Sequence, residues 1–303
     1  MKILVTGSTG LVGSALVRSL NLQGHDVVRL LRKRQNFAEA CAFWDYRKNH
    51  IEAEKLEGLD AVVHLAGENI ASGLWSDAKK KAIYNSRIQG TAFLSKTLAE
   101  LETPPKAMIC ASAIGYYGSK GDKPLTEVSD KGTGFLAETC KDWENAASPA
   151  KEAGIRVAYA RLGIVLSPHG GALQLMYWPF KLGLAGNLGN GKQYMSWVML
   201  DDVVGALSHL VSNDTLSGPV NVVAPEPVTN AEFTSTMRKT LIPPFLPMHY
   251  WTPPAPAIII SLLLGGLGDE LLLASANVKP IRLLETGYQF KYPQLKSALK
   301  AVL

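Results

Sequence analysis

The residues near the start of the chain that are best suited to chemistry are the glycines of one short run, Gly7-Ser8-Thr9-Gly10-Leu11-Val12-Gly13. The run follows an apolar, β-branched segment and precedes apolar residues at helical spacing, which predicts a strand, a tight turn and a helix. Gly7 permits the turn, Gly10 lets backbone N–H groups approach a pyrophosphate, and Gly13 allows close packing of helix on strand. Unpaired N–H groups at a helix start favour an anion, so this run predicts a dinucleotide site.

The end of the second expected strand, Asp26 to Leu31, selects the form of the dinucleotide. An NAD site usually places an acid there to hold the ribose 2′-OH, whereas this chain has Arg32, Lys33 and Arg34 and no acid before Glu39. Three cations suit a 2′-phosphate, and an arginine can pair with it through two nitrogens. We therefore expect NADP(H), with Ser8 within reach of the phosphate. The alternative is a solvated basic loop.

Two further strand ends could contribute to the same cofactor. A third strand, Cys41 to Trp44, ends at Asp45, which could contact the adenine amino group or cap the next turn. A fully apolar strand then runs through His64 into Leu65-Ala66-Gly67, and small residues at a carboxyl end leave room for a cofactor. We interpret His64, inside the apolar run, as a packed core residue.

Hydroxyl-bearing residues follow the next apolar strand, which starts at Lys106. It ends in Ser112, Tyr116 and Tyr117, and its carboxyl end faces the same crevice as the glycine run because parallel strands end at one edge. These three residues are the candidates for binding and proton transfer at a substrate oxygen. For the two tyrosines the alternative is packing against cofactor or substrate.

Arg161 lies within a later apolar strand, Ile155 to Leu166, where a charge needs either a buried anionic partner or a ligand. We count it among the cofactor contacts while leaving both interpretations open. Beyond this strand, a set of polar and aromatic residues could meet the diphosphate and ring of a substrate: Lys181, Lys192, Gln193 and Trp197. For Lys192 and Gln193 the alternative is a solvated loop.

Composition bounds the class of protein. The 303 residues carry a net charge of +5 without a block of like charges, so nucleic-acid binding is not indicated. Three cysteines without a C-x-x-C pair argue against disulfides and a zinc site and for a reducing compartment. The N-terminus does not have the pattern of a signal peptide, and the most apolar window, Ala255 to Leu264, is too short to cross a bilayer. We expect a cytoplasmic protein without a metal and without a membrane partner.

The elements that must position these residues alternate between strands and helices, which predicts a doubly wound parallel α/β sheet of the Rossmann type. Residues 1–166 are expected to form the NADP-binding domain, completed by about 195–225. Residues 167–194 and 226–303 are expected to form a smaller substrate-binding lobe, because glycine- and proline-rich segments there depart from the alternating pattern.

Several motifs together resemble a known family. TGSTGLVG at the N-terminus, HLAG at 64–67, ASAIGYYG at 111–118 and SWVMLDDVV at 196–204 are similar to the extended short-chain dehydrogenase/reductases. LAGENIASGLW, FLAETCKDWE and KPIRLLETGYQFKYP resemble more closely the sugar-nucleotide epimerase-like subgroup. The resemblance implies a nucleotide-sugar or similar carbonyl or hydroxyl substrate, a Ser role for Ser112, and a homodimer paired through Rossmann helices.

The chain departs from the wider family at its catalytic motif, Tyr-x-x-x-Lys. Depending on the alignment, the two positions hold Leu136 and Cys140 or Phe135 and Thr139. The substitute acid could be Tyr116, Tyr117, or Glu138 or Lys141 on the following helix. Two functions therefore stay open: an NADP-dependent epimerase or reductase, and an NADPH-binding regulatory or partner protein with little or no turnover.

Overall fold

The computed structural model describes residues 1–34, 37–73, 75–264 and 266–303, apart from the side chains of 261, 263 and 264. Its first elements are β1 (Lys2–Thr6), α1 (Leu11–Leu22) and β2 (Asp26–Leu31), the predicted β-α-β unit. β1 and β2 pair in parallel, so the glycine run lies at the carboxyl edge between them and α1.

An eight-stranded sheet forms the centre of the molecule, in the order β12-β8-β6-β5-β1-β2-β3-β4. Its other strands are β3 (Ala40–Asp45), β4 (His50–Ile51), β5 (Ala61–His64), β6 (Ala107–Ala113), β8 (Arg156–Leu162) and β12 (Gly218–Val222). Every neighbouring pair is parallel except β3 with β4. The predicted doubly wound α/β fold is confirmed.

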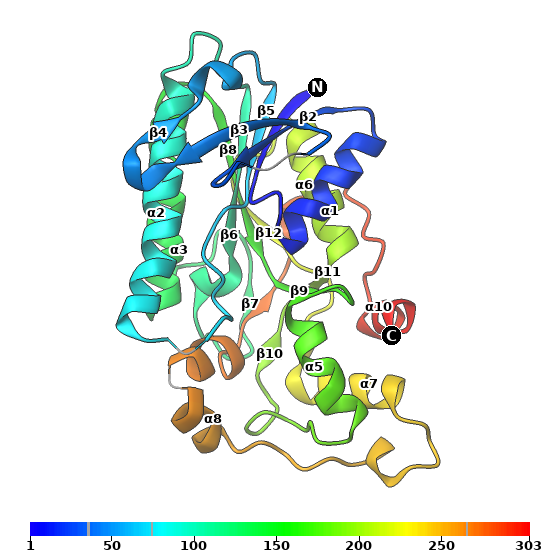
Figure 1. Ribbon diagram of the computed structural model, residues 1–303. Helices are drawn as coiled ribbons and strands as arrows, with labels where there is room; N and C mark the ends of the chain where they lie inside the picture. Colours follow the sequence, from blue (N-terminus) through cyan, green and yellow to red (C-terminus); the bar gives the residue numbers. More distant parts are fainter. Residues whose placement is uncertain (35–36, 74, 265) are drawn as a thin grey trace.

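Helices cover both faces of the sheet (Figure 1). α1 and α6 (Leu200–Ser212) pack on one face, where Leu16 and Val203 share a core with Ile3 and Val63. On the other face lie α2 (Asp77–Ala99), α3 (Phe135–Asn145) and α4 (Ser148–Glu152). Burial of both sheet faces explains why the central strands are apolar throughout rather than alternating.

The remaining elements lie mostly beyond the carboxyl ends of the strands (Figure 1), except that the helix Ile281–Glu285 packs along β12 at the edge of the sheet. They are the short strands β7 (Pro124–Leu125), β9 (Ile164–Leu166), β10 (Tyr194–Met195), β11 (Trp197–Met199), β13 (Val228–Thr229) and β14 (Asn277–Val278), and the helices α5 (Gly171–Lys181), α7 (Asn230–Leu241), α8 (Ala257–Leu264), α9 (Ile281–Glu285) and α10 (Leu295–Val302). Single turns are η1 (Tyr46–Lys48), η2 (Ala53–Leu56), η3 (Ile114–Tyr117), η4 (Pro247–His249) and η5 (Gly268–Leu272). No helix in the described parts combines the length and apolar composition that crossing a bilayer requires.

The C-terminal segment returns to the sheet region at two places. β14 pairs in parallel with β7, which follows β6 and η3 in the chain. The buried carboxylate of Asp202, on α6, accepts hydrogen bonds from the backbone N–H groups of Lys291 at 2.6 Å and Tyr292 at 2.9 Å. These contacts hold the C-terminal segment against β7 and α6.

Candidate functional site

The glycine run forms a tight backbone cradle between β1 and α1. Gly7 has φ +63°, and a Cβ there would lie 2.8 Å from the backbone of Leu65. A Cβ on Gly13 would lie only 2.2 Å from the Gly7 carbonyl oxygen. Both positions therefore exclude larger residues for the reasons that the sequence predicted, turn geometry and close helix packing.

Two features of this cradle suit an anion. Gly10 is the N-cap of α1 and offers no side chain, so the N–H groups of Leu11, Val12 and Gly13 have no partner within the helix. The Ser8 hydroxyl oxygen is buried and makes no hydrogen bond with a described residue. An orphaned buried hydroxyl beside a helix N-terminus fits a phosphate-bearing ligand.

An arginine within β2 contacts the backbone of the cradle. Arg29 donates to the Ser8 carbonyl oxygen at 2.9 Å and pairs with Glu39, Nε to Oε2, at 2.9 Å. These hydrogen bonds lower the pKa of Glu39 to about 2. Glu39, the first acid after the three cations in the sequence, is therefore held by Arg29 and Asn21. Sequence reasoning missed Arg29, although a charge within an apolar strand was the available signal.

The three cations after β2 differ in their contacts. Arg34 pairs with Glu52 at 2.6 Å and lies over the Phe43 ring. Arg32 and Lys33 are exposed and take part in no ion pair with a described residue. These two cations remain available to a ligand at the end of β2.

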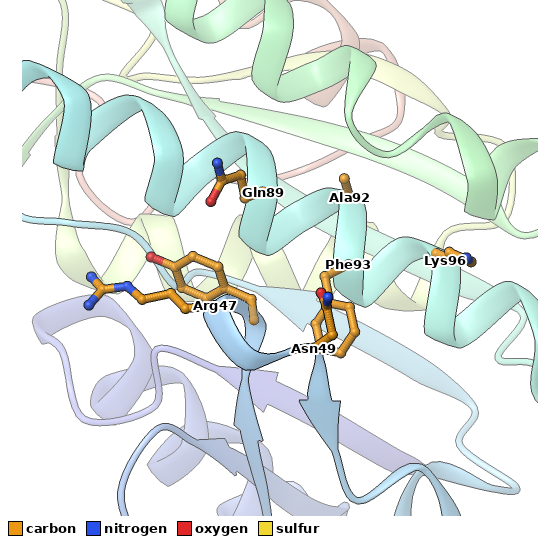
Figure 2. Close-up of a pocket in the computed structure, with 7 residues that line it drawn as sticks. Arg47, Asn49, Gln89, Ala92, Phe93 and Lys96 are labelled. Atoms are coloured by element: carbon orange, nitrogen blue, oxygen red, sulfur yellow. The ribbon is translucent and has the colours of Figure 1, made fainter.

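Asp45, at the end of β3, caps the next turn as one of its two interpretations predicted. Its Oδ1 accepts a hydrogen bond from the Arg47 backbone N–H at 3.1 Å; the adenine contact stays a prediction. Figure 2 shows a hollow close by, between η1 and α2. Its lining residues are Tyr46, Arg47, Asn49, Gln89, Ala92, Phe93 and Lys96, and none of them is a predicted site residue.

The end of β5 lies directly against the cradle. The backbone N–H groups of Leu65 and Ala66 both donate to the Thr6 hydroxyl oxygen at 3.0 Å, and Gly67 is exposed beyond them. His64 is fully buried between the hydroxyls of Thr6 and Thr91, and burial lowers its pKa to about 4. The prediction of a core histidine is confirmed.

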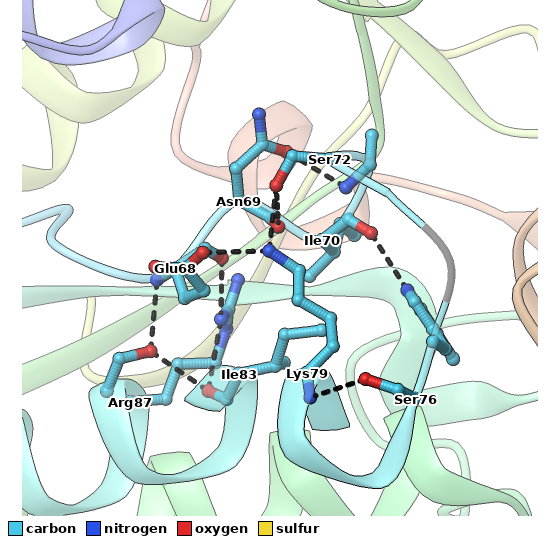
Figure 3. Close-up of polar contacts among 11 residues, drawn as sticks. Glu68, Asn69, Ile70, Ser72, Ser76, Lys79, Ile83 and Arg87 are labelled. Atoms are coloured by element: carbon cyan, nitrogen blue, oxygen red, sulfur yellow. Dashed lines mark hydrogen bonds and ion pairs between the residues drawn. The ribbon is translucent and has the colours of Figure 1, made fainter. Parts of the chain in front are cut away.

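A cluster of charged groups follows Gly67 (Figure 3). Lys79, on α2, pairs with Glu68 at 2.7 Å, which lowers the pKa of that carboxyl. Arg87 lies on α2, C-terminal to Lys79. Its Nη1 donates to the carbonyl oxygens of Glu68 at 3.0 Å and Ile83 at 3.2 Å. Nothing in the spacing of the sequence indicated Arg87.

Ser112 and Arg161 meet at one buried carboxylate. They face each other across β6 and β8, and both donate to Glu144 Oε1, at 2.7 and 2.8 Å. A second bond joins Arg161 Nη2 to Glu144 Oε2 at 2.8 Å. Arg161 therefore has the buried anionic partner that was one of its two predicted explanations, and its assignment as a cofactor contact stays a prediction. Glu144, on α3, was missed.

The two candidate tyrosines have different environments. Tyr117 is fully buried; its hydroxyl accepts from Arg161 at 2.9 Å and donates to Asn221 at 2.8 Å, and burial raises its pKa. These bonds give Tyr117 a structural role, and its catalytic role stays a prediction. Tyr116 is half-buried, its ring centre lies 3.5 Å from Arg161 Cζ, and its hydroxyl makes no hydrogen bond with a described residue.

Side chains of α3 lie next to η3, and they include Leu136 and Cys140, the pair that one of the two alignments places at the dyad positions. A Cβ on Gly115 would lie 3.2 Å from Leu136 Cβ and 3.8 Å from Cys140 Sγ. Leu136, Cys140 and Glu144 thus form one row along α3, four residues apart, facing this strand end. Burial raises the pKa of Cys140 to about 12, which argues against a thiolate nucleophile at neutral pH.

The predicted substrate residues divide into two pairs. Lys181 is exposed, with its ammonium 2.9 Å from the Tyr177 hydroxyl, and Lys192 is exposed on its loop. Gln193 and Trp197 are buried, and they donate to backbone carbonyl oxygens of Leu188, Leu272 and Glu226. The polar atoms of these two residues hold loops together, and their contact with a substrate stays a prediction. Among the described residues no cluster of His, Cys, Asp and Glu could hold a metal ion.

Comparisons with known proteins agree on one family. A family model described as "NAD dependent epimerase/dehydratase family" matches residues 3–223, and a model of a domain of unknown function, DUF1731, matches 255–302. Epimerase family protein Mb2239 of Mycobacterium bovis is 40% identical over 98% of this chain and 96% of its own length.

Two solved structures extend the likeness to three dimensions. The human epimerase family protein SDR39U1, crystallised with NADPH, is 32% identical with a TM-score of 0.88, over 100% of this chain and 99% of that one. A protein described as a nucleoside-diphosphate sugar epimerase from Corynebacterium glutamicum is 36% identical with a TM-score of 0.80. That alignment covers 99% of this chain and 57% of the other.

Proposed function

Because the chain belongs to the NAD dependent epimerase/dehydratase family, we propose that it binds NADP(H) and catalyses an epimerase- or reductase-type reaction on a nucleotide sugar or a similar small carbonyl or hydroxyl compound. The observation that carries the proposal is the glycine cradle at the end of β1. Its free N–H groups and the buried Ser8 hydroxyl match the needs of a diphosphate-bearing ligand.

Preference for the 2′-phosphorylated cofactor is supported by charge. Arg32 and Lys33 directly follow β2 and form no ion pair with a described residue, while Glu39 is bound by Arg29. Without a free carboxylate at this corner, a 2′-phosphate meets cations and no opposing acid. The NADPH present in the human relative's structure is consistent with this preference.

The catalytic step would use residues at the carboxyl end of β6. A bound nicotinamide supplies or accepts the hydride, and the protein must move a proton at the substrate oxygen. Tyr116 carries the one phenol of η3 whose hydroxyl has no hydrogen-bond partner among the described residues. We assign the transfer of the proton at the substrate oxygen to the Tyr116 hydroxyl. Ser112 supports the site by fixing Glu144, since its hydroxyl donates to that carboxylate.

A second function is favoured by one observation, the apolar row on α3. With Leu136 and Cys140 at the dyad positions and Ser112 turned to Glu144, the usual proton-transfer groups have no direct counterparts. An NADPH-binding regulatory or partner protein would need only the cradle and the basic corner. The two functions differ in turnover and share cofactor binding.

The test is a fluorescence titration of wild-type protein and the Arg32→Ala variant with NADPH and NADH. We expect NADPH to bind at least about tenfold tighter than NADH, about 1.4 kcal/mol, and Arg32→Ala to lose this preference. Arg34→Ala is the matched control, because Arg34 is already paired with Glu52 and should matter less. Equal binding of both cofactors would refute the selectivity.

Hydride transfer separates the two functions. Wild-type protein is incubated with NADPH and a panel of nucleotide-ketosugars and small carbonyl compounds. Oxidation of NADPH is followed as the loss of absorbance of its reduced nicotinamide. Oxidation of NADPH that Tyr116→Phe abolishes supports the enzyme. Tight NADPH binding without oxidation across the panel supports the regulatory function.

A further inference from the structure

Arg87 is a largely enclosed cation without a carboxylate partner. No described Asp or Glu forms an ion pair with its guanidinium, and the neighbouring Glu68 carboxylate is bound by Lys79. Its protein contacts are two backbone carbonyl oxygens, both bonded by Nη1, and the face of Trp143, 4.9 Å away. Burial lowers the pKa of Arg87. An enclosed charge that lacks a counter-ion is costly unless a ligand supplies one.

The position of this cation next to the cradle is fixed by two glycines. A Cβ on Gly7 would contact Leu65 and Ala66, and a Cβ on Gly67 would lie 3.4 Å from Arg87 Cζ. The end of β5 therefore touches the cradle at Gly7 and the Arg87 guanidinium at Gly67. Because Gly67 is exposed, a ligand that lies over the cradle and Gly67 comes within reach of Arg87.

Two nitrogens of Arg87 remain free for such a ligand. Nε and Nη2 make no hydrogen bond with a described residue, and neither is among the described polar atoms sealed from solvent without a partner. Nη1 is held by the carbonyl oxygens of Glu68 and Ile83, so the plane of the guanidinium is set before a ligand arrives (Figure 3). A planar pair of donors on a fixed arginine matches two oxygens of a phosphate.

We propose that Arg87 binds a diphosphate group lying over Gly67, through its Nε and Nη2 atoms. This inference rests on the proposed function, because the diphosphate belongs either to the dinucleotide cofactor or to a nucleotide-sugar substrate. Both sources share the same chemistry, and the experiment below separates them.

The experiment compares Arg87→Gln with wild-type protein in titrations with NADPH, NADH, 2′-AMP and, on the NADPH-loaded protein, UDP. If the cofactor supplies the diphosphate, Arg87→Gln weakens NADPH and NADH alike by at least about tenfold and leaves 2′-AMP, which lacks a diphosphate, unchanged. If the substrate supplies it, NADPH binding is unchanged and UDP binding falls by about the same factor. Arg18→Gln is the matched control, since Arg18 is an exposed arginine on α1.

The outcomes also distinguish this inference from the proposed function. Wild-type protein that binds none of the four probes refutes both. Wild-type binding that Arg87→Gln retains, within the range of Arg18→Gln, overturns the role of Arg87 alone.

Thermal denaturation of each variant controls for folding. Should Arg87→Gln melt earlier than wild type, Arg87→Lys becomes the deciding variant, because it keeps a cation over Trp143 but loses the two-nitrogen fork. Weaker binding of NADPH or UDP to Arg87→Lys supports the inference, and wild-type binding of both overturns it.

Discussion

Arg161 and Glu144 form a two-point ion pair in which both side chains are almost completely enclosed, with exposed fractions of 3% and 10%. The pair joins β8 to α3 and also holds Ser112 on β6. Through Tyr117 it reaches Asn221 on β12. One carboxylate thus connects three adjacent strands and a helix at the carboxyl edge of the sheet.

Removing this carboxylate should destabilise the protein strongly. Glu144→Gln leaves the Arg161 charge buried without a counter-ion, so we expect the free energy of unfolding to fall by about 3–5 kcal/mol. Urea denaturation measures it. Asp201→Asn, which breaks the exposed pair with Lys291, should cost less than about 1 kcal/mol. Equal losses in the two variants would contradict the structural role of the buried pair.

Loss of the hydroxyl should lower the free energy of unfolding much more at Tyr117 than at Tyr116, the two tyrosines of η3. Tyr117→Phe removes a group bonded to Arg161 and Asn221, and we expect a loss of about 1–3 kcal/mol in unfolding free energy. Tyr116→Phe removes a hydroxyl without a described partner, so stability should change by less than about 0.5 kcal/mol. Denaturation of both variants tests this contrast, and a larger loss for Tyr116→Phe would reverse our assignment.

Substitution by alanine should be tolerated at one glycine of the cradle and not at another. In Gly13→Ala the new Cβ would lie 2.2 Å from the Gly7 carbonyl oxygen, so the cradle must shift and NADPH binding should fall by more than about tenfold. In Gly10→Ala the same oxygen is 3.3 Å away and φ is −80°, which needs only a small adjustment. Titration of both variants measures the difference; comparable NADPH affinities would argue against a rigid cradle.

His64 should make stability depend on pH between about 6.5 and 4. The folded protein keeps this residue neutral to about pH 4, whereas the unfolded chain protonates it at its ordinary pKa of 6.5. The unfolded state therefore binds more protons in this window, and the free energy of unfolding falls as the pH is lowered, by up to roughly 3 kcal/mol. Denaturation at several pH values measures the slope.

His64→Asn is the variant that isolates this contribution. Burial also lowers the pKa of His209. The pH dependence of the unfolding free energy that His209 contributes should therefore remain in the variant. The carboxylates with low pKa values, Glu39 and Glu52 at about 2, act mainly below this window. An unchanged slope in His64→Asn would show that other groups cause the pH dependence.

The sequence predicted what depends on local geometry. The glycine cradle is formed by contacts among a few residues between β1 and α1, and it is present as predicted. Alternation of strands and helices predicted the parallel sheet, since each apolar strand is covered on both faces.

What the sequence did not predict depends on distant partners. Arg161 and Glu144 are 17 residues apart on different elements, and only the packing of α3 against β6 and β8 brings them together. Gln193 and Trp197 have side chains suited to a ligand, but the bonds that occupy them come from backbone carbonyls up to 79 residues away. Residue type alone cannot tell such a contact from binding. The division into a cofactor domain and a substrate lobe stays a prediction.

The return of the C-terminal segment to the sheet joins two segments of the chain that separate family models match. The family models match 3–223 and 255–302 as separate segments, yet the carboxylate of Asp202 in the first is bonded by backbone groups of Lys291 and Tyr292 in the second. The strand pair of β7 with β14 joins them again. Deleting the second segment would remove the backbone N–H partners of the Asp202 carboxylate and the strand that pairs with β7. The two separately matched segments are therefore held together by hydrogen bonds in one fold.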